Sequence, residues 1–167
     1  EENLLSTFNT SGNQEVQRRV LEALGYSSRE EVKSLIEKAF QEKDPRWLAS
    51  ALFAMGRSAD RQWESQISIM INHRNDEVRA EAVRAAGELE LVNLRQALIE
   101  KATDMEEVWD VRVASIWSLS QLGGEDARET LEELLEMAED DDEAEILEEA
   151  LDNLSFTDDQ HIFGFSL

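Results

Sequence analysis

Apolar and polar positions along the chain follow a helical pattern that occurs five times. In each copy, an apolar residue is followed by small or apolar residues four, five and eight positions later, and three copies place glycine at the ninth position. This spacing puts the apolar side chains on one face of an α-helix. The copies begin at Val16, Trp47, Val78, Val111 and Ile146, which gives steps of 31, 31, 33 and 35 residues.

A second helical pattern lies between successive copies and keeps steps of 31, 31 and 33 residues. Its three columns are Ile36, Ile67, Leu98 and Leu131; Phe40, Ile71, Ala102 and Leu135; and Val32, Trp63, Leu94 and Ala127. The two patterns predict an all-α fold, an α-solenoid of about five two-helix repeats with one continuous apolar layer. The expected helices span residues 3–9, 13–25, 28–42, 45–57, 60–73, 76–89, 92–104, 107–122, 125–139 and 143–154.

Capping residues support the predicted helix boundaries. Asp44 followed by Pro45 fits an N-cap with proline at the first helical position, and Asn75 fits an N-cap before the third copy of the first pattern. Ser28 with Glu31 fits a capping box. Three glycines, Gly25, Gly56 and Gly123, are expected near helix ends, where a left-handed residue is easiest for glycine.

The repeat register also predicts how the chain is divided. Leu5 lies 31 residues before Ile36, so residues 1–12 are expected to be the end of a truncated preceding repeat. Residues 13–154 are expected to form the repeat array, and residues 155–167 a C-terminal tail. The chain would then be a piece of a longer solenoid.

Composition narrows the function classes. The 167 residues include 38 acidic and 16 basic side chains, a net charge of −22, which disfavours nucleic acid and anionic membranes as partners. Residues 125–167 hold 17 of the acids and one base. This segment is expected to be either a solubilising cap of the solenoid or a docking surface for a basic partner.

Candidate catalytic chemistry is sparse. There is no cysteine, there are two histidines, and no phosphate-binding loop or nucleophile motif is present. The acidic run at residues 140–143 lacks the spacing of a calcium loop. No metal, cofactor or small-molecule ligand is therefore expected, and the default compartment is the cytoplasm.

Residues 76–87 and 110–123 resemble the HEAT-repeat family, in the short form also found in phycobilisome-lyase-like proteins. The resemblance rests on an acid, Val-Arg, small residues and a final Gly, and is clearest in Asp76-Glu77-Val78-Arg79 and Asp110-Val111-Arg112. It implies a right-handed α-α superhelix whose concave side is formed by the helices of the first pattern. It also implies a structural ladder of Arg79 and Arg112 with acids such as Asp76 and Asp110.

The same resemblance implies scaffolding or protein recognition, and it directs attention to the concave side. The candidate partner-binding residues are those that the core pattern does not use: Phe53, Arg57, Arg84, Trp117 and Gln121. Aromatic and Arg side chains are enriched at binding hot spots. The alternative is that Phe53 and Trp117 pack between repeats as part of a wide apolar face.

The first hypothesis for function is a non-catalytic scaffold or adaptor that binds a protein partner through the concave face. In that hypothesis, Phe53 and Trp117 anchor the partner, and Arg57 and Arg84 pair with its acids. The alternatives are a bilin lyase-like subunit, which rests on the resemblance alone, and a regulatory segment of a larger protein.

Overall fold

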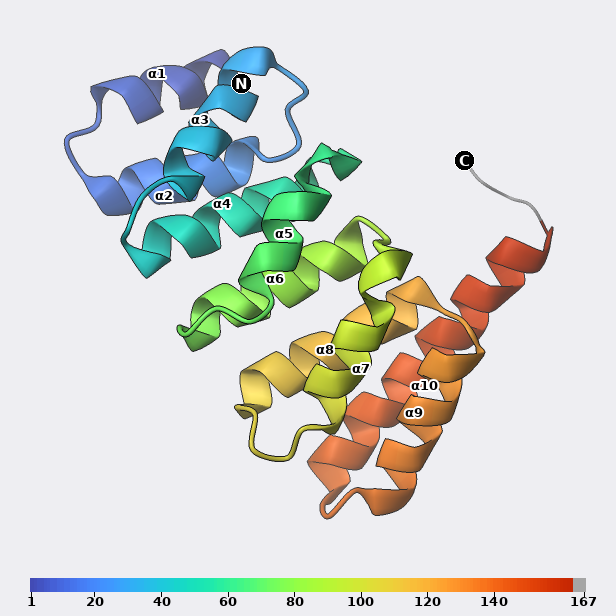
Figure 1. Ribbon diagram of the computed structural model, residues 1–167. Helices are drawn as coiled ribbons and strands as arrows, with labels where there is room; N and C mark the ends of the chain where they lie inside the picture. Colours follow the sequence, from blue (N-terminus) through green and yellow to red (C-terminus); the bar gives the residue numbers. More distant parts are fainter. Residues whose placement is uncertain (164–167) are drawn as a thin grey trace.

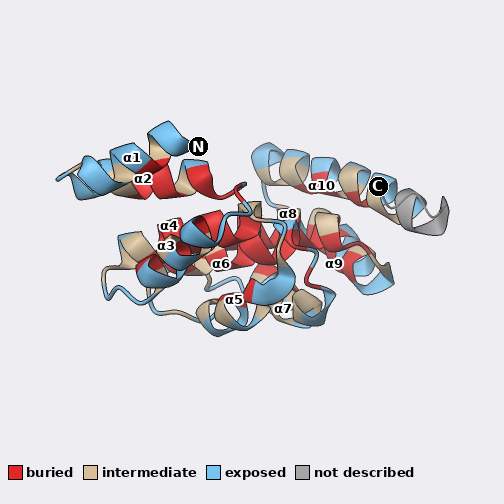
Figure 2. Ribbon diagram, turned by 90° about the horizontal axis from the view of Figure 1, so that it is seen from above, coloured by how far each residue is buried: buried red, intermediate tan, exposed pale blue. Residues whose placement is uncertain are grey.

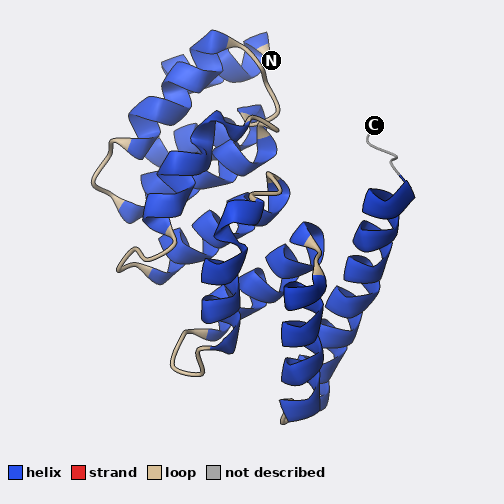
Figure 3. Ribbon diagram, turned by 45° about the vertical axis from the view of Figure 1, so that its right-hand side comes forward, coloured by secondary structure: helices blue, strands red, loops and turns tan. Residues whose placement is uncertain are grey.

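The computed structural model describes the backbone of residues 1–163 and the side chains of residues 1–159, and this part of the chain contains helices but no strand (Figure 3). Two short 3-10 helices, η1 (Arg61–Trp63) and η2 (Val92–Leu94), precede α5 and α7. The α-helices are α1 (Glu2–Thr10), α2 (Gln14–Leu24), α3 (Glu30–Phe40), α4 (Pro45–Arg57), α5 (Glu64–Met70), α6 (Asp76–Glu88), α7 (Arg95–Thr103), α8 (Trp109–Leu122), α9 (Glu125–Met137) and α10 (Asp141–Phe163).

The helices form two layers. The inner layer consists of α2, α4, α6, α8 and α10, and each of these helices packs against the next along the chain. Figure 2 shows the inner helices following an arc, with α3, α5, α7 and α9 on its outer side. The helices follow one another along the stack in the order of the sequence (Figure 1). The expected α-solenoid of two-helix repeats is therefore confirmed.

The helices pair differently from what the expected division of the chain into repeats implies. Each outer helix packs on the inner helix that follows it, so that α1 pairs with α2, α3 with α4, and so on to α9 with α10. The expected boundary after residue 12 thus separates two helices that pack as a pair. The expected boundary after residue 154 lies inside α10, which continues to Phe163. The period of about 31 residues is the same for either phase, so the spacing alone could not distinguish them.

The predicted apolar columns form the core. In the first four copies of the first pattern, the residue five positions after the start is completely buried: Leu21, Leu52, Val83 and Ile116. The first column of the second pattern, on the outer helices, is equally buried: each of its side chains is at most 1% exposed, namely Ile36, Ile67, Leu98 and Leu131. Burial of a Leu or Ile side chain contributes about 1.5–3 kcal/mol. Because each column faces the next repeat, the contribution is shared between neighbouring repeats.

Glycine sets the distance between successive inner helices. A Cβ atom on Gly56 would lie 3.0 Å from Ala85 Cα, and one on Gly87 would lie 2.8 Å from Ser118 Cα. Gly25 has the same relation to Ala54, at 3.0 Å. The pattern places these glycines in one column, and each meets a small residue of the next inner helix. Their function is therefore close packing between helices.

This finding corrects the expected role of two glycines. Gly56 lies inside α4, and Gly25 follows α2 with a right-handed φ of −51°, so neither is a left-handed helix end. The expectation holds for Gly123, which ends α8 with φ of +62°. At the interface between α8 and α10, Ser120 occupies the position that glycine takes in the earlier repeats. Its hydroxyl accepts a hydrogen bond of 2.9 Å from Asn153 Nδ2. A polar contact therefore replaces the close approach between α8 and α10.

Two of the three predicted N-caps are present. Asp44 Oδ1 accepts from Arg46 N–H at 3.0 Å, and Asn75 Oδ1 accepts from Val78 N–H at 3.1 Å. The expected capping box of Ser28 and Glu31 is absent, since α3 starts one residue later with Arg29 at the N-cap position and no side-chain hydrogen bond there.

The glycine column generates a stability prediction. Gly87→Ala should lower the free energy of unfolding by about 1–2 kcal/mol, because overpacking against the Ser118 backbone outweighs the higher helix propensity of alanine. Gly12→Ala is the control, as a Cβ there would meet nothing within 4 Å. Urea unfolding followed by circular dichroism measures both. Equal stability of Gly87→Ala and the unsubstituted protein would contradict the packing role.

Candidate protein-binding groove

The open side of the inner layer carries a groove that runs across α2, α4, α6 and α8. Its hollows share lining residues, so that one leads into the next: Phe53 and Glu81 line two of them, and Arg84 and Glu88 also line more than one. The hollow between α6 and α8 has a volume of about 280 Å³. All five candidate residues, Phe53, Arg57, Arg84, Trp117 and Gln121, line this groove.

The two candidate aromatic residues are half-buried. Phe53 lies on α4 between two hollows, and Trp117 lies on α8 beside Val113 and Gln121. Neither ring belongs to the buried core cluster. Each therefore keeps part of its surface available in the groove.

Arg57 is held from three sides. Its guanidinium lies 5.1 Å from the centroid of the Phe53 ring and 5.4 Å from that of Tyr26, within the range of cation–π attraction. Its Nη1 donates to Tyr26 Oη, and its Nε lies 3.6 Å from Glu88 Oε1. These contacts fix the orientation of Arg57 and cover one side of Phe53.

Arg84 also has an internal partner. Its Nη1 donates to Glu81 Oε1 at 2.6 Å, one turn earlier on α6, while 45% of its own side chain remains exposed. Sequence reasoning identified Arg57 and Arg84 but did not predict that each already pairs with a carboxylate. The Arg84 partner lies three positions earlier, and the Arg57 partner lies in the next repeat.

Two carboxylates that were not among the candidate binding residues, Glu81 and Glu88, also line the groove. Burial raises the pKa of Glu81 against the lowering effect of Arg84, and the neighbouring Glu88 and Glu22 raise it further. Burial also raises the pKa of Glu88, against Arg57 and Arg84. Their arginine partners thus offset the burial of these two carboxylates only in part.

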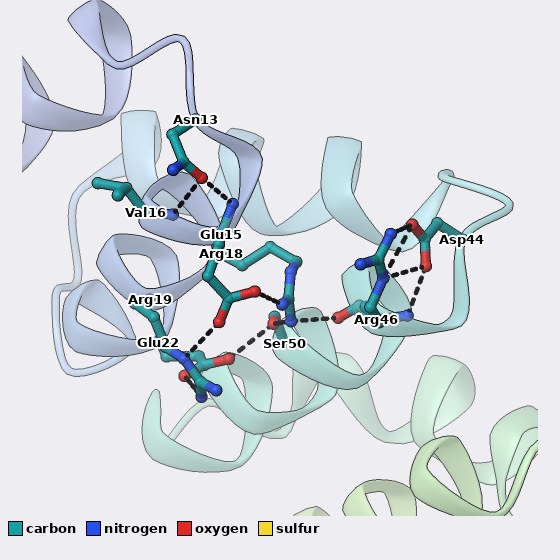
Figure 4. Close-up of polar contacts among 9 residues, drawn as sticks. All are labelled: Asn13, Glu15, Val16, Arg18, Arg19, Glu22, Asp44, Arg46 and Ser50. Atoms are coloured by element: carbon teal, nitrogen blue, oxygen red, sulfur yellow. Dashed lines mark hydrogen bonds and ion pairs between the residues drawn. The ribbon is translucent and has the colours of Figure 1, made fainter.

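A polar network joins α2 to α4 at one end of the groove (Figure 4). Arg18 is 7% exposed, and its Nη1 donates to Ser50 Oγ at 3.3 Å and to the Arg46 carbonyl at 3.4 Å, while its Nη2 donates to Glu15. Ser50 Oγ donates in turn to Glu22 Oε1 at 2.7 Å. Because a buried guanidinium requires such partners, the network fixes the relative position of the first two inner helices.

The two arginines of the predicted ladder connect neighbouring repeats. Arg79 Nη1 donates to the His73 carbonyl at 2.9 Å, and its Nη2 donates to Asp76 at 2.8 Å and to Glu107 Oε1 at 2.5 Å. Glu107 lies in the loop before α8, so this ion pair bridges two inner helices.

Arg112 makes the equivalent bridge further along the stack. Its Nη2 donates to Glu143 on α10 at 3.1 Å, and its Nε donates to the Ala102 carbonyl at 3.3 Å. Among the described side chains, no cation lies within ion-pair distance of Asp110, which was expected to take part. Asp76 thus contacts Arg79 within α6, and the links to the next repeat are made by Glu107 and Glu143.

A second ladder on the outer helices was missed by the sequence analysis. Three of its side chains contact a residue near the start of the next outer helix: Lys33 contacts Asp60 at 3.0 Å, Glu64 contacts Asn93 at 3.1 Å, and Arg95 contacts Asp126 at 3.2 Å. The fourth, Arg128 on α9, contacts Asp158 on α10 at 2.9 Å. Lys33, Glu64, Arg95 and Arg128 recur at steps of 31, 31 and 33 residues. This polar column was the signal available in the sequence.

The acidic C-terminal segment forms the last helix pair of the stack, α9 with α10. Among the described side chains of α9 and α10, acids occupy most of the exposed positions, whereas Leu131, Leu147 and Leu154 are buried. Asp158 also accepts from Gly124 N–H at 3.0 Å. This part of the expected tail is therefore packed against the repeats.

Metal ligands do not gather in the described part of the chain, where no cluster of three or more His, Asp or Glu side chains has a suitable arrangement. Within residues 1–163, no helix combines the length and apolarity needed to cross a bilayer.

Fold and groove together define an α-solenoid of two-helix repeats with an open inner surface. A sequence model of HEAT repeats matches residues 63–154, which is more than half of the chain. The chain belongs to the HEAT-repeat family. A comparison with curated proteins gives no match. HEAT repeats are commonly scaffolds for protein interactions and are generally non-enzymatic.

The Arg79–Glu107 bridge generates a pH-dependent prediction. Burial acts to raise the pKa of Glu107, but hydrogen bonds from Arg79, the Val108 N–H and Lys101 outweigh it and lower the pKa from 4.5 to about 2. Glu107→Gln should therefore lower the free energy of unfolding at pH 7 by about 3 kcal/mol. The lowered pKa stabilises the fold above about pH 4.5, and this contribution is lost as the pH falls towards 2.

The stability difference between Glu107→Gln and the unsubstituted protein should therefore shrink between pH 5 and pH 3, as measured by urea unfolding at several pH values. Glu106→Gln, an exposed neighbour, is the control and should change stability by less than about 0.5 kcal/mol. A difference that stays constant over this pH range would show that the charge of Glu107 is not responsible.

Proposed function

We propose that this protein is a non-catalytic scaffold or adaptor that binds a protein partner in the groove across α2, α4, α6 and α8. The observation that carries the proposal is the continuous groove, in which the half-buried rings of Phe53 and Trp117 lie on separate repeats. A partner segment that follows the groove would contact both rings. Truncation of such an aromatic anchor typically costs 2 kcal/mol or more at a hot spot.

Preorganisation supports the same proposal. The Arg18 network, the Arg79 bridge and the glycine contacts hold the inner helices relative to one another before any partner binds. Arg57 and Gln121 flank the two rings and define the edges of the hollows. A rigid surface loses little conformational entropy on association, which favours binding.

Capture of partners tests this proposal. The protein and a Phe53→Ala/Trp117→Ala variant are immobilised and exposed to lysate of cells that express the protein, and retained proteins are identified by mass spectrometry. We expect one or more proteins to be retained by the unsubstituted protein and lost from the variant, since the two truncations together should weaken binding at least tenfold.

The matched control removes apolar surface from the outer layer. Ile69→Ala/Met137→Ala truncates side chains that are 69% and 65% exposed on α5 and α9, and should leave capture unchanged. Circular dichroism establishes that both variants are folded. Retention of the same proteins by all three baits would contradict a binding role for the groove.

A further inference from the structure

The cations and the acids of the groove differ in what they already contact. Arg57 pairs with Glu88 and lies against two aromatic rings, and Arg84 pairs with Glu81. Arg19 on α2 pairs with both Glu15 and Glu22. Each groove arginine that reaches solvent thus has a carboxylate partner within the protein.

Two groove acids have no such partner. Glu77 and Asp110 are exposed and line one hollow of the groove together with Asp76 and Arg84. Among the described side chains, no cation lies within ion-pair distance of Glu77 or Asp110. The groove therefore has carboxylates in excess of its available cations.

Carboxylates also line both hollows beside Phe53. One hollow is lined by Glu22, Glu77 and Glu81 with Arg18 and Arg19, and the hollow on its other side by Glu81 and Glu88 with Arg57 and Arg84. The pKa values of Glu81 and Glu88 are raised by burial in spite of their arginine partners. An additional cation in these hollows would offset the remaining cost of burying their charges.

We propose that the occupant of the groove is a cationic peptide segment of another protein, with Lys or Arg side chains interspersed with apolar ones. This inference rests on the proposed function and specifies the chemistry of its partner. The cationic side chains would lie in the hollows beside Glu77, Glu81 and Asp110, and the apolar ones would contact Phe53 and Trp117. Charge complementarity is what selects this partner.

An anionic segment fits the same groove poorly. Its carboxylates would have to displace Glu81 from Arg84, an ion pair of 2.6 Å, or Glu88 from Arg57. They would also approach Glu77 and Asp110, and like charges brought together at an interface are destabilising. The initial expectation that Arg57 and Arg84 pair with acids of the partner is replaced by this assignment.

Two labelled peptides test the assignment. Both are amphipathic helices of about 18 residues with leucine on one face, and they carry either lysine or glutamate on the other. Binding is measured by fluorescence anisotropy at about 0.15 M salt, where long-range attraction to the acidic protein is screened beyond roughly 8 Å. We expect the lysine peptide to bind and the glutamate peptide not to bind.

Matched variants distinguish the groove from general acidity. Glu77→Gln/Asp110→Asn should weaken binding of the lysine peptide at least about fivefold, because both acids face the occupant. Glu132→Gln/Glu136→Gln removes the same charge from exposed positions on α9 and should weaken it less than about twofold. Trp117→Ala should also weaken binding at least about fivefold, since Trp117 contacts the apolar face of the peptide.

Three results would overturn the assignment: preference for the glutamate peptide, absence of lysine-peptide binding, or equal weakening by the two charge-removing variants. The capture experiment with Phe53→Ala/Trp117→Ala decides the proposed function separately. Capture that depends on Phe53 and Trp117, together with failure of the lysine peptide, would leave the groove as a protein-binding site with a different class of partner.

Discussion

Close packing between successive inner helices is the constraint on which the other features depend. Gly56 and Gly87 allow the backbone of α4 to meet α6, and that of α6 to meet α8, without an intervening side chain. The inner layer is thus drawn together, whereas the outer helices of neighbouring repeats make few contacts with one another. A stack that is narrower on one side than on the other must curve, and the groove lies on the narrow side.

Polar contacts then fix how each repeat sits on the next. Arg79 and Arg112 join the inner layer through acids about 30 residues further on, and the outer ladder does the same from Lys33 to Arg128. Both ladders connect only neighbouring repeats, so the fold is held by a sum of local interfaces. The groove crosses three of these interfaces, and its shape therefore depends on each of them.

Much of the fold could be predicted from the sequence because helix periodicity and repeat spacing are strong signals. The columns through Leu52 and Ile67 identified the buried faces, and the positions left over gave Phe53 and Trp117 as candidates for the concave side. The phase of the helix pairs could not be predicted, because a period of about 31 residues fits both phases equally. The last helix was expected to end at residue 154, but α10 continues to Phe163, because no glycine or proline occurs between Ser155 and Phe163 to end it.

The electrostatic character of the groove was harder to predict than its position. Arg57 looks free in the sequence, but Glu88, its partner, lies one repeat away and reaches it only through the close approach at Gly56. Ion-pair partners separated by 27 to 31 residues cannot be recognised from the pattern of one helix. Counting the Arg57–Glu88 pair across repeats together with the Arg84–Glu81 pair within α6 leaves the groove with more unpaired carboxylates than unpaired cations.

The two layers also respond differently to mechanical load. When a beam bends, the material along its neutral axis keeps its length while the opposite side stretches or shortens. Backbone contacts at Gly56 and Gly87 give the inner layer little freedom to lengthen, whereas the side-chain links of the outer layer can extend. Bending of this solenoid should then pivot about the inner helices, so that the spacing of Phe53, Arg84 and Trp117 is retained while the outer helices separate.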